Sequence, residues 1–315
     1  MNTHICSCAL WVMSARIEPD VRSMVGRVAV VTGGNRGLGW WTALGLARAH
    51  AEVVVTTRSL PRARTAVDKI RSLVPEAEVR LELLDLSSLG SVRTFVERMV
   101  HGSPIDLLVN CAGAVIPSRE ITEDGLERTL ATDYLGPFAL TLGLLPALLR
   151  SPHPRVTMVS SMGAEKGKGK IDFADLQGER KYSPQLAYNQ AKLADLMFAI
   201  ELGQRASSSG LPLISNAAHP GLARTDLQWG VRGRRPSAGI RFLMSLFAQR
   251  PEDAVRSILR AATDPAAISG SYYGPEHGLK GDPVLSTVYS GALDQGARTH
   301  LWSVSETLTG VRWQP

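Results

Sequence analysis

The chain has 315 residues, of which 44% are hydrophobic and 20% are charged, and its formal net charge is +6. This composition is ordinary for a globular protein with a substantial core, and it argues against a disordered or fibrous chain. The densest basic cluster, VRGRR at 231–235, is short and carries no aromatic residues, so a solvated loop is favoured over contact with nucleic acid or another anionic partner.

We expect residues 1–24 to form a flexible arm outside the fold. The apolar run ICSCALWVM, at residues 5–13, is well short of the roughly 20 residues that a membrane-spanning helix needs. No basic segment precedes it, so it makes a poor signal peptide. The sequence therefore predicts no membrane span.

The cysteines indicate a reducing compartment. Cys6, Cys8 and Cys111 form neither a disulfide framework nor a CxxC metal pair. We therefore expect no metal site and a cytoplasmic protein.

From residue 25 onward, short β-branched runs alternate with helical patterns. Strands are predicted at 27–32, 52–57, 79–86, 106–110, 155–161 and 212–221, and helices at 40–50, 61–73, 89–100, 123–149 and 184–207. The tail predicts a last strand, a loop and a final helix, with 290–309 packed against the body. Such alternation is typical of an α/β protein with a parallel sheet. No linker or repeat divides residues 25–315, so we predict a single doubly wound, Rossmann-type domain with helices on both faces of the sheet.

The turn after the first strand predicts a dinucleotide site. VTGGNRGLG, at 31–39, places Gly33, Gly37 and Gly39 between a strand and a helix. Glycines allow a sharp turn and close approach to a pyrophosphate, and the helix N-terminus offers free N–H groups. Because the strand and the helix flank the glycines correctly, the motif meets its context test.

The end of the second predicted strand favours NADP(H) over NAD(H). An NAD site usually ends this strand with an acidic residue that binds the ribose 2′-hydroxyl. Here the strand ends in Thr57 and Arg58, and Arg36 lies within the glycine turn. Two guanidinium groups without a carboxylate suit a 2′-phosphate.

Taken together, the motifs resemble the short-chain dehydrogenase/reductase family over about residues 26–310. The matching pieces are TGGNRGLG (32–39), Asp85-Leu86, NCAG (110–113), Ser160-Ser161, YNQAK (188–192) and HPGLART (219–225). The stretch 160–198 is most similar to the branch that holds retinol dehydrogenases and protochlorophyllide reductases. The cofactor site implied by these motifs comprises Gly33, Asn35, Arg36, Gly37, Leu38, Gly39, Arg58, Asp85, Leu86, Asn110, Ala112, Gly113, Tyr188, Lys192, Pro220, Gly221 and Thr225.

Tyr188 and Lys192 are separated by one helical turn, which suits proton transfer. A phenol has a pKa near 10, and a neighbouring ammonium favours its ionised form. Tyr188 is therefore the expected proton donor or acceptor. Ser161 is expected to bind the substrate oxygen. The resemblance implies that Lys192 also holds the nicotinamide ribose and that Thr225 reaches the carboxamide.

One residue departs from the family pattern. In the family, a segment like VNHLGHF carries an asparagine that holds a water connecting the lysine to solvent. The matching segment TDYLGPF, at 132–138, has Asp133 at that position. A carboxylate near Lys192 would offset part of its positive field. We hypothesise that Asp133 is a working substitute and the fourth catalytic residue, with altered or impaired chemistry as the alternative.

The segment at about 222–250 is expected to cover the substrate. It contains Trp229 and the apolar run GIRFLMSLF at 239–247, which favour a bulky hydrophobic substrate. The same run is also consistent with a helix packed on its own core or with a dimer contact. Monomer and homo-oligomer both remain open.

The sequence therefore predicts an NADP(H)-dependent oxidoreductase, of the carbonyl reductase or alcohol dehydrogenase type, that acts on a hydrophobic small molecule. One alternative is a non-enzymatic NADP-binding regulator or scaffold on the same fold. A second is a reductase of a conjugated C=C bond, which the resemblance to protochlorophyllide reductases allows.

Overall fold

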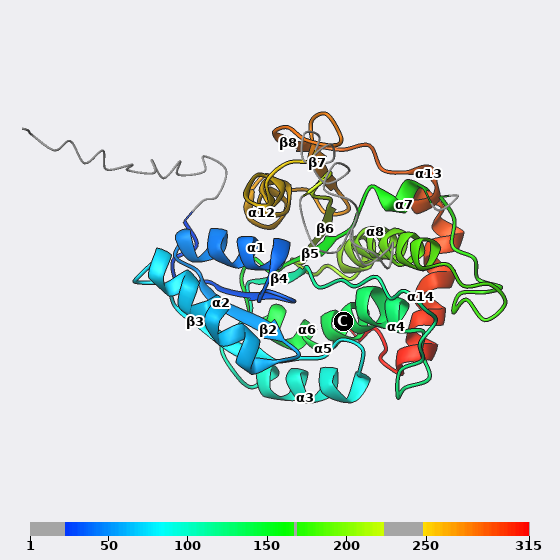
Figure 1. Ribbon diagram of the computed structural model, residues 1–315, viewed down its shortest axis with the longest axis horizontal. Helices are drawn as coiled ribbons and strands as arrows, with labels where there is room; N and C mark the ends of the chain where they lie inside the picture. The colour runs from blue at the N-terminus through cyan, green and yellow to red at the C-terminus, as the bar shows by residue number, and fades with distance from the viewer. Residues whose placement is uncertain (1–22, 167–168, 224–247, 315) are drawn as a thin grey trace, which may run out of the picture.

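The computed structural model describes residues 23–166, 169–223 and 248–314, which build a sheet covered by helices on both faces (Figure 1). The strands are β1 Val28–Val31, β2 Glu52–Thr57, β3 Val79–Leu83, β4 Leu107–Asn110, β5 Arg155–Val159, β6 Ile214–Ala218, β7 Tyr272–Pro275 and β8 Pro283–Leu285. They form one eight-stranded sheet in the order β3-β2-β1-β4-β5-β6-β7-β8. Neighbouring strands are parallel except β7 and β8, which are antiparallel.

The helical segments connect these strands. They are α1 Gly37–Arg48, α2 Leu60–Leu73, α3 Leu89–Val100, α4 Arg128–Leu130, a π-helical turn η1 Ala131–Leu135, α5 Gly136–Gly143, α6 Leu145–Leu148, α7 Gly163–Lys166, α8 Pro184–Ser208, α11 Pro251–Ala254, α12 Arg256–Thr263, α13 Ser290–Leu293 and α14 Gln295–Thr309. The predicted α/β, doubly wound fold is therefore confirmed.

Two hydrophobic cores cover the two faces of the sheet. Helices α1, α2 and α12 pack on one face, where Leu44, Ile70 and Leu259 are buried. Helices α3, α5, α8 and α14 supply the other core, which includes Phe138 and Trp302. Strand β2 is buried along nearly its whole length, as expected of a β-branched strand in a parallel sheet covered on both sides.

The predicted helix at 123–149 is wrong in its extent. Helix α4 begins only at Arg128, because the Glu127 carboxylate accepts hydrogen bonds from the N–H groups of Thr129 and Leu130, at 2.8 and 2.7 Å. The chain then makes the π-helical turn η1 before α5. Pro137 lacks the N–H that a regular α-helix needs there, and a widened turn accommodates this loss.

The tail is richer than the sequence predicts. Where one strand is predicted, the structure has two, β7 and β8. Helices α11 and α12, which are not predicted, precede them. The predicted packing of 290–309 against the body is confirmed by α14, whose Trp302 is 2% exposed. Met24, assigned to the flexible arm, is 3% exposed and donates its N–H to Ala49. The rest of that arm, 1–22, lies outside the described residues.

Candidate active site

The predicted motifs meet at one edge of the sheet. Parallel strands β1, β4, β5 and β6 end at the same edge, and β1 lies between β2 and β4. The connections therefore diverge to the two sides of β1, which makes a crevice at the carboxyl ends of the strands. The glycine turn, the NCAG segment, Ser161 and the HPG segment each follow one of these strands.

The glycine turn has the close packing and free N–H groups that a pyrophosphate needs. A Cβ added to Gly39 would lie 2.4 Å from the carbonyl oxygen of Gly33, so no larger residue fits there. Gly33 and Gly37 have positive φ angles of 65° and 56°, which glycine adopts at little cost. Arg36 begins α1 in an extended conformation without a side-chain cap. The first N–H groups of α1 thus remain available to an anion.

The β4 side of the crevice is held by Thr32. Its Oγ1 accepts hydrogen bonds from the N–H groups of Cys111 and Ala112, at 2.9 and 3.0 Å. Asn110 ends β4 and its Nδ2 donates to Thr141 Oγ1 at 3.0 Å. Its side chain therefore points into the core, and only its backbone could face a cofactor. Gly113 follows in the same segment: a Cβ there would lie 3.6 Å from Lys192 Nζ.

The other expected cofactor residues lie around the same crevice. Arg58 follows β2 and is exposed, as is Arg36. Asp85 Oδ1 accepts hydrogen bonds from both the N–H and the hydroxyl of Ser87 and thereby shapes the turn after β3.

The remaining cofactor residues border the turn after β3 or follow β6. A Cβ on Gly136 would lie 2.2 Å from the carbonyl oxygen of Leu86, so η1 and the β3 turn touch. Gly221 follows Pro220 with a φ of 63°. Thr225 and most of the segment at 222–250 lie outside the described residues.

Ser161, Tyr188 and Lys192 come together beside this crevice. Ser161 follows β5, and its Oγ accepts a hydrogen bond from the Gly163 N–H at 3.0 Å. Tyr188 and Lys192 lie on α8, with Lys192 Nζ 5.9 Å from the centre of the Tyr188 ring. The Ser161 hydroxyl lies close enough to the Tyr188 phenol to lower its pKa.

Lys192 lies between two buried carboxylates. Its Nζ is 2.9 Å from Asp195 Oδ2 and 3.7 Å from Asp133 Oδ2, and it also donates to the Val159 carbonyl at 3.1 Å. Burial by itself lowers the pKa of the ammonium, but the two carboxylates outweigh this effect and the pKa is raised overall. Lys192 is therefore charged throughout the physiological range.

Asp133 faces Lys192 as the segment match predicts. Its Oδ1 accepts a hydrogen bond from the Ala114 N–H at 2.7 Å, while Oδ2 has no hydrogen-bond partner among the described residues. Burial raises the pKa of this carboxyl to about 6, against the opposing charge of Lys192. Asp133 is thus placed to act on Lys192.

The phenol of Tyr188 is less acidic than the sequence predicts. Burial raises its pKa, and the carboxylates of Asp133 and Asp195 raise it further. The Lys192 ammonium and the Ser161 hydroxyl lower it. The net direction is upward. Lys192 acts as expected, but burial and the two carboxylates outweigh its field.

A family model described as short chain dehydrogenase matches residues 27–235. The chain belongs to the short-chain dehydrogenase family. It is therefore an oxidoreductase, and the family's chemistry is hydride transfer with a nicotinamide cofactor.

Named relatives place this short-chain dehydrogenase in the retinol dehydrogenase-like branch. Polyprenol dehydrogenase from Mus musculus is 38% identical, covering 96% of this chain and 91% of its own length. Retinol dehydrogenase 13 from Homo sapiens is 34% identical, covering 94% and 90% respectively. A solved structure of an uncharacterized protein from Mycobacterium paratuberculosis superimposes with a TM-score of 0.79 at 34% identity, covering 94% of this chain and 98% of its own.

Two residues of this short-chain dehydrogenase site are not expected from the motifs. Asp195 contacts Lys192, and its position three residues later on one helix is the signal that could have identified it. His219 is 3% exposed, and its Nδ1 accepts the Gly221 N–H at 3.3 Å. Burial lowers the pKa of His219 to about 4, so a neutral ring supports the turn that holds Gly221.

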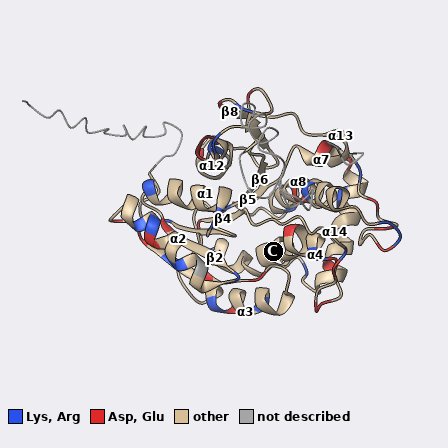
Figure 2. Cartoon of the chain, viewed as in Figure 1, with Lys and Arg blue, Asp and Glu red and all other residues tan. Residues whose placement is uncertain are grey.

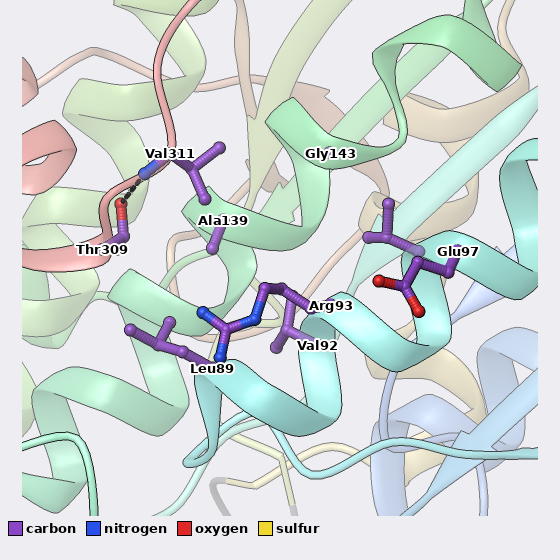
Figure 3. Close-up of a pocket in the computed structure, with 9 residues that line it drawn as sticks. Leu89, Val92, Arg93, Glu97, Ala139, Gly143, Thr309 and Val311 are labelled. Atoms are coloured by element: carbon purple, nitrogen blue, oxygen red, sulfur yellow. Dashed lines mark hydrogen bonds between the residues drawn. The ribbon is translucent and has the colours of Figure 1, made fainter.

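A separate pocket lies away from this chemistry. The pocket has a volume of about 200 Å³ and lies between α3, α5 and the end of α14. Figure 3 shows its lining, in which apolar side chains such as Val92 and Val311 lie together with Arg93 and Glu97. None of Ser161, Tyr188 and Lys192 lines it, so we assign it no part in the reaction.

Membrane-spanning helices and metal clusters are both absent from the described part of the chain. There, none of the helices combines the length and apolar character needed to cross a bilayer. No group of three or more histidine, cysteine, aspartate or glutamate side chains within residues 23–166, 169–223 and 248–314 is arranged to hold a metal ion.

Proposed function

We propose that this protein is an NADP(H)-dependent oxidoreductase that interconverts an alcohol and a carbonyl group on a hydrophobic small molecule. The observation that carries the proposal is the convergence of Ser161, Tyr188 and Lys192 at the carboxyl edge of β5, next to the glycine turn. A protein that only bound a nucleotide would have no need of all three side chains.

The residues divide the chemistry between them. When bound, NADP(H) supplies or accepts the hydride. Tyr188 donates a proton to the substrate oxygen during reduction, or accepts it during alcohol oxidation. Ser161, whose hydroxyl lies near that phenol, binds the same oxygen and stabilises the negative charge that develops on it. Lys192 provides the positive charge that favours the phenolate.

The surroundings of β2 support NADP(H). Thr57 ends the strand, and its Oγ1 accepts a hydrogen bond from the Ser59 N–H at 3.1 Å. The position of the usual acidic residue is therefore occupied by the Thr57 hydroxyl, which already accepts a hydrogen bond from the backbone of Ser59. Figure 2 shows lysine and arginine positions along α2, which begins just after Arg58. A 2′-phosphate of about −2 charge suits this basic edge better than a free hydroxyl does.

The relatives support a hydrophobic alcohol as the substrate class. Two of them are named for polyprenol and retinol. The apolar run GIRFLMSLF, at 239–247, agrees with such a substrate. We therefore propose retinol-like and polyprenol-like alcohols, and the matching aldehydes, as the first compounds to assay.

The test is a turnover assay on the purified chain. NADPH and NADH are offered with aldehydes, and NADP⁺ and NAD⁺ with alcohols, and the products are identified by mass. We expect NADPH to support reduction better than NADH does. Tyr188→Phe should lower kcat by at least about 10²-fold, the scale of a lost general acid.

Tyr134→Phe is the matched control. Tyr134 is also a buried tyrosine, but its hydroxyl bonds Ser305 and faces away from the site, at 2.7 Å from Ser305 Oγ. This variant should keep its activity. NADPH binding without turnover of any compound would instead favour a binding protein, and a product reduced at a conjugated C=C bond would favour a C=C reductase.

A further inference from the structure

The Lys192 ammonium has one more acidic neighbour than its neutralisation requires. Asp195 approaches it from within α8 at 2.9 Å, and Asp133 approaches from η1 at 3.7 Å. The side chains of Lys192, Asp133 and Asp195 are 5%, 0% and 1% exposed. With every group ionised, this cluster carries a net charge of −1 in a water-poor environment.

The hydrogen bonds in the cluster are incomplete. Asp195 Oδ1 and Asp133 Oδ2 are buried and have no hydrogen-bond partner among the described residues. An unpartnered carboxylate oxygen inside a protein is costly. Because these two buried carboxylates lower stability and lie beside Tyr188, they are candidates for a functional role.

We propose that Asp195 is a positioning residue for the reaction: with Asp133 it holds the Lys192 ammonium between two carboxylates and limits the positive field that reaches the Tyr188 phenol. This inference rests on the proposed function, in which Tyr188 transfers the proton. Asp195 itself touches neither the phenol nor the expected substrate position in the described contacts. It acts by holding Lys192, and its charge also raises the pKa of the phenol across the space between them.

The shifts in proton affinity agree with this geometry. Burial raises the pKa of Asp195 to about 7 and that of Asp133 to about 6, and the Asp133 carboxylate also disfavours the ionisation of Asp195. Above about pH 7, both carboxylates are therefore charged while Tyr188 still holds its proton. Removing one of them leaves a neutral cluster and a stronger positive field on the phenol.

Other charged or titratable groups also face this cluster. They come from several elements and are Glu127 before α4, Cys111 after β4, Tyr134 on η1, Tyr188 on α8 and Tyr272 on β7. Asp195 lies nearest to Lys192 among the carboxylates. Its removal should therefore change the field on Tyr188 without altering the groups that hold Asp133.

The test measures the pH at which Tyr188 loses its proton. In Asp195→Asn the phenol pKa should fall by about one unit, at the lower end of shifts caused by a nearby charge. The midpoint of the rise in alcohol oxidation with pH should move down by the same amount. Asp195→Glu keeps the charge and should keep the wild-type midpoint.

Two matched variants separate this role from a structural one. Glu201→Gln removes another buried carboxylate of α8, one that pairs with Arg205 and Arg298 and not with Lys192. It should lower stability and leave the midpoint in place. Asp195→Ser is a smaller neutral replacement and should show the same shift as Asp195→Asn.

The same shift can be read without turnover. The ultraviolet difference on titration between each variant and its Tyr188→Phe counterpart isolates the ionisation of that one phenol. If the chain turns over no alcohol or carbonyl compound, the proposed function fails while this titration still tests Asp195. An unmoved phenol pKa in a folded neutral variant overturns the inference, as does the failure of both neutral variants to fold, because Asp195 would then serve stability alone.

Discussion

At the scale of single residues, the choice of cofactor depends on the side chains at the end of β2 and directly after it. Thr57 is buried at the strand end, with its hydroxyl bonded to the Ser59 N–H. Arg58 is the next residue and its side chain is exposed. An exposed guanidinium can bind a phosphate bidentately, whereas it gains little from a ribose hydroxyl. Discrimination between the two nucleotides should therefore reside mainly in one exposed side chain.

Arg58→Ala should weaken the binding of NADPH about tenfold, which corresponds to roughly 1.4 kcal/mol and to the loss of one charge-assisted hydrogen bond. NADH has no 2′-phosphate, so its Kd should change less than about twofold. Isothermal titration of both nucleotides measures the difference. Arg150→Ala, a change to an exposed arginine that donates to the Val100 and Gly102 carbonyls, is the control. An equal loss for both nucleotides would assign Arg58 to general cofactor binding.

The proposed catalytic residues show what local sequence can and cannot predict. Tyr188, Lys192 and Ser161 were identifiable because their spacing and order are set by one helix and one strand end. Asp133 was identifiable only through its match to a family segment. Asp195 belongs to none of the recognised motifs: its spacing of three residues from Lys192 allows the contact, but the burial of both side chains is set by the tertiary fold.

At the scale of elements, α14 fixes the far end of α8. Trp302 stacks on Phe198 with ring centres 5.5 Å apart and also packs against Phe138 at 5.3 Å. The Arg205 guanidinium lies over the Trp302 ring at 4.3 Å. The buried pair of Arg298 and Glu201, at 3.4 Å, joins the same two helices. The C-terminal helix is therefore part of the scaffold that holds Tyr188 in place.

Trp302→Ala should lower the free energy of unfolding by about 3 to 5 kcal/mol, the usual cost of removing a buried tryptophan side chain. Urea titration followed by circular dichroism measures this change. Leu293→Ala is the control, because Leu293 is 57% exposed and such a change should stay within about 0.5 kcal/mol. If Trp302→Ala lowers the free energy of unfolding by less than about 1 kcal/mol, α14 does not contribute to the stability of the fold.

Long elements with a clear period were predictable, and short or irregular ones were not. The long helix expected at 184–207 is α8, Pro184–Ser208, and the strand expected at 52–57 matches β2. Strand β8 has only three residues, Pro283–Leu285, too few for a recognisable alternation. The π-helical turn η1 accommodates Pro137, and the adjacent Gly136 packs against the Leu86 carbonyl, a tertiary contact that the local sequence does not reveal.

At the scale of the whole molecule, His219 links folding to pH. Its ring is buried beside Tyr272, with ring centres 5.1 Å apart, and a Cβ on Gly274 would lie 1.9 Å from its Nε2. The pKa of His219 falls from 6.5 to about 4 in the folded chain because of burial. The unfolded chain therefore binds this proton more readily. The stability contributed by His219 is complete above pH 6.5 and is lost as the pH falls through about 4.

His219→Gln should flatten the pH dependence of unfolding between about pH 6.5 and 4. The wild-type chain should lose about 3 kcal/mol from this group over that window, at about 1.4 kcal/mol for each pKa unit. Comparing the slopes of the two proteins removes the packing that glutamine also disturbs. His153→Gln, at an exposed position, should leave the slope unchanged. Equal slopes for His219→Gln and the wild type would show that the folded and unfolded chains bind the His219 proton equally.

Helix α8 also limits how this protein can diverge in evolution. Its 25 residues carry Tyr188, Lys192 and Asp195 near one end, and Glu201 nearer the other. Each residue of an α-helix turns about 100° around the axis. Inserting or deleting one residue between Asp195 and Glu201 would therefore leave the catalytic spacing intact and swing Glu201 away from Arg298. Substitutions can accumulate along α8, whereas a change in its length would separate the reaction chemistry from the scaffold that supports it.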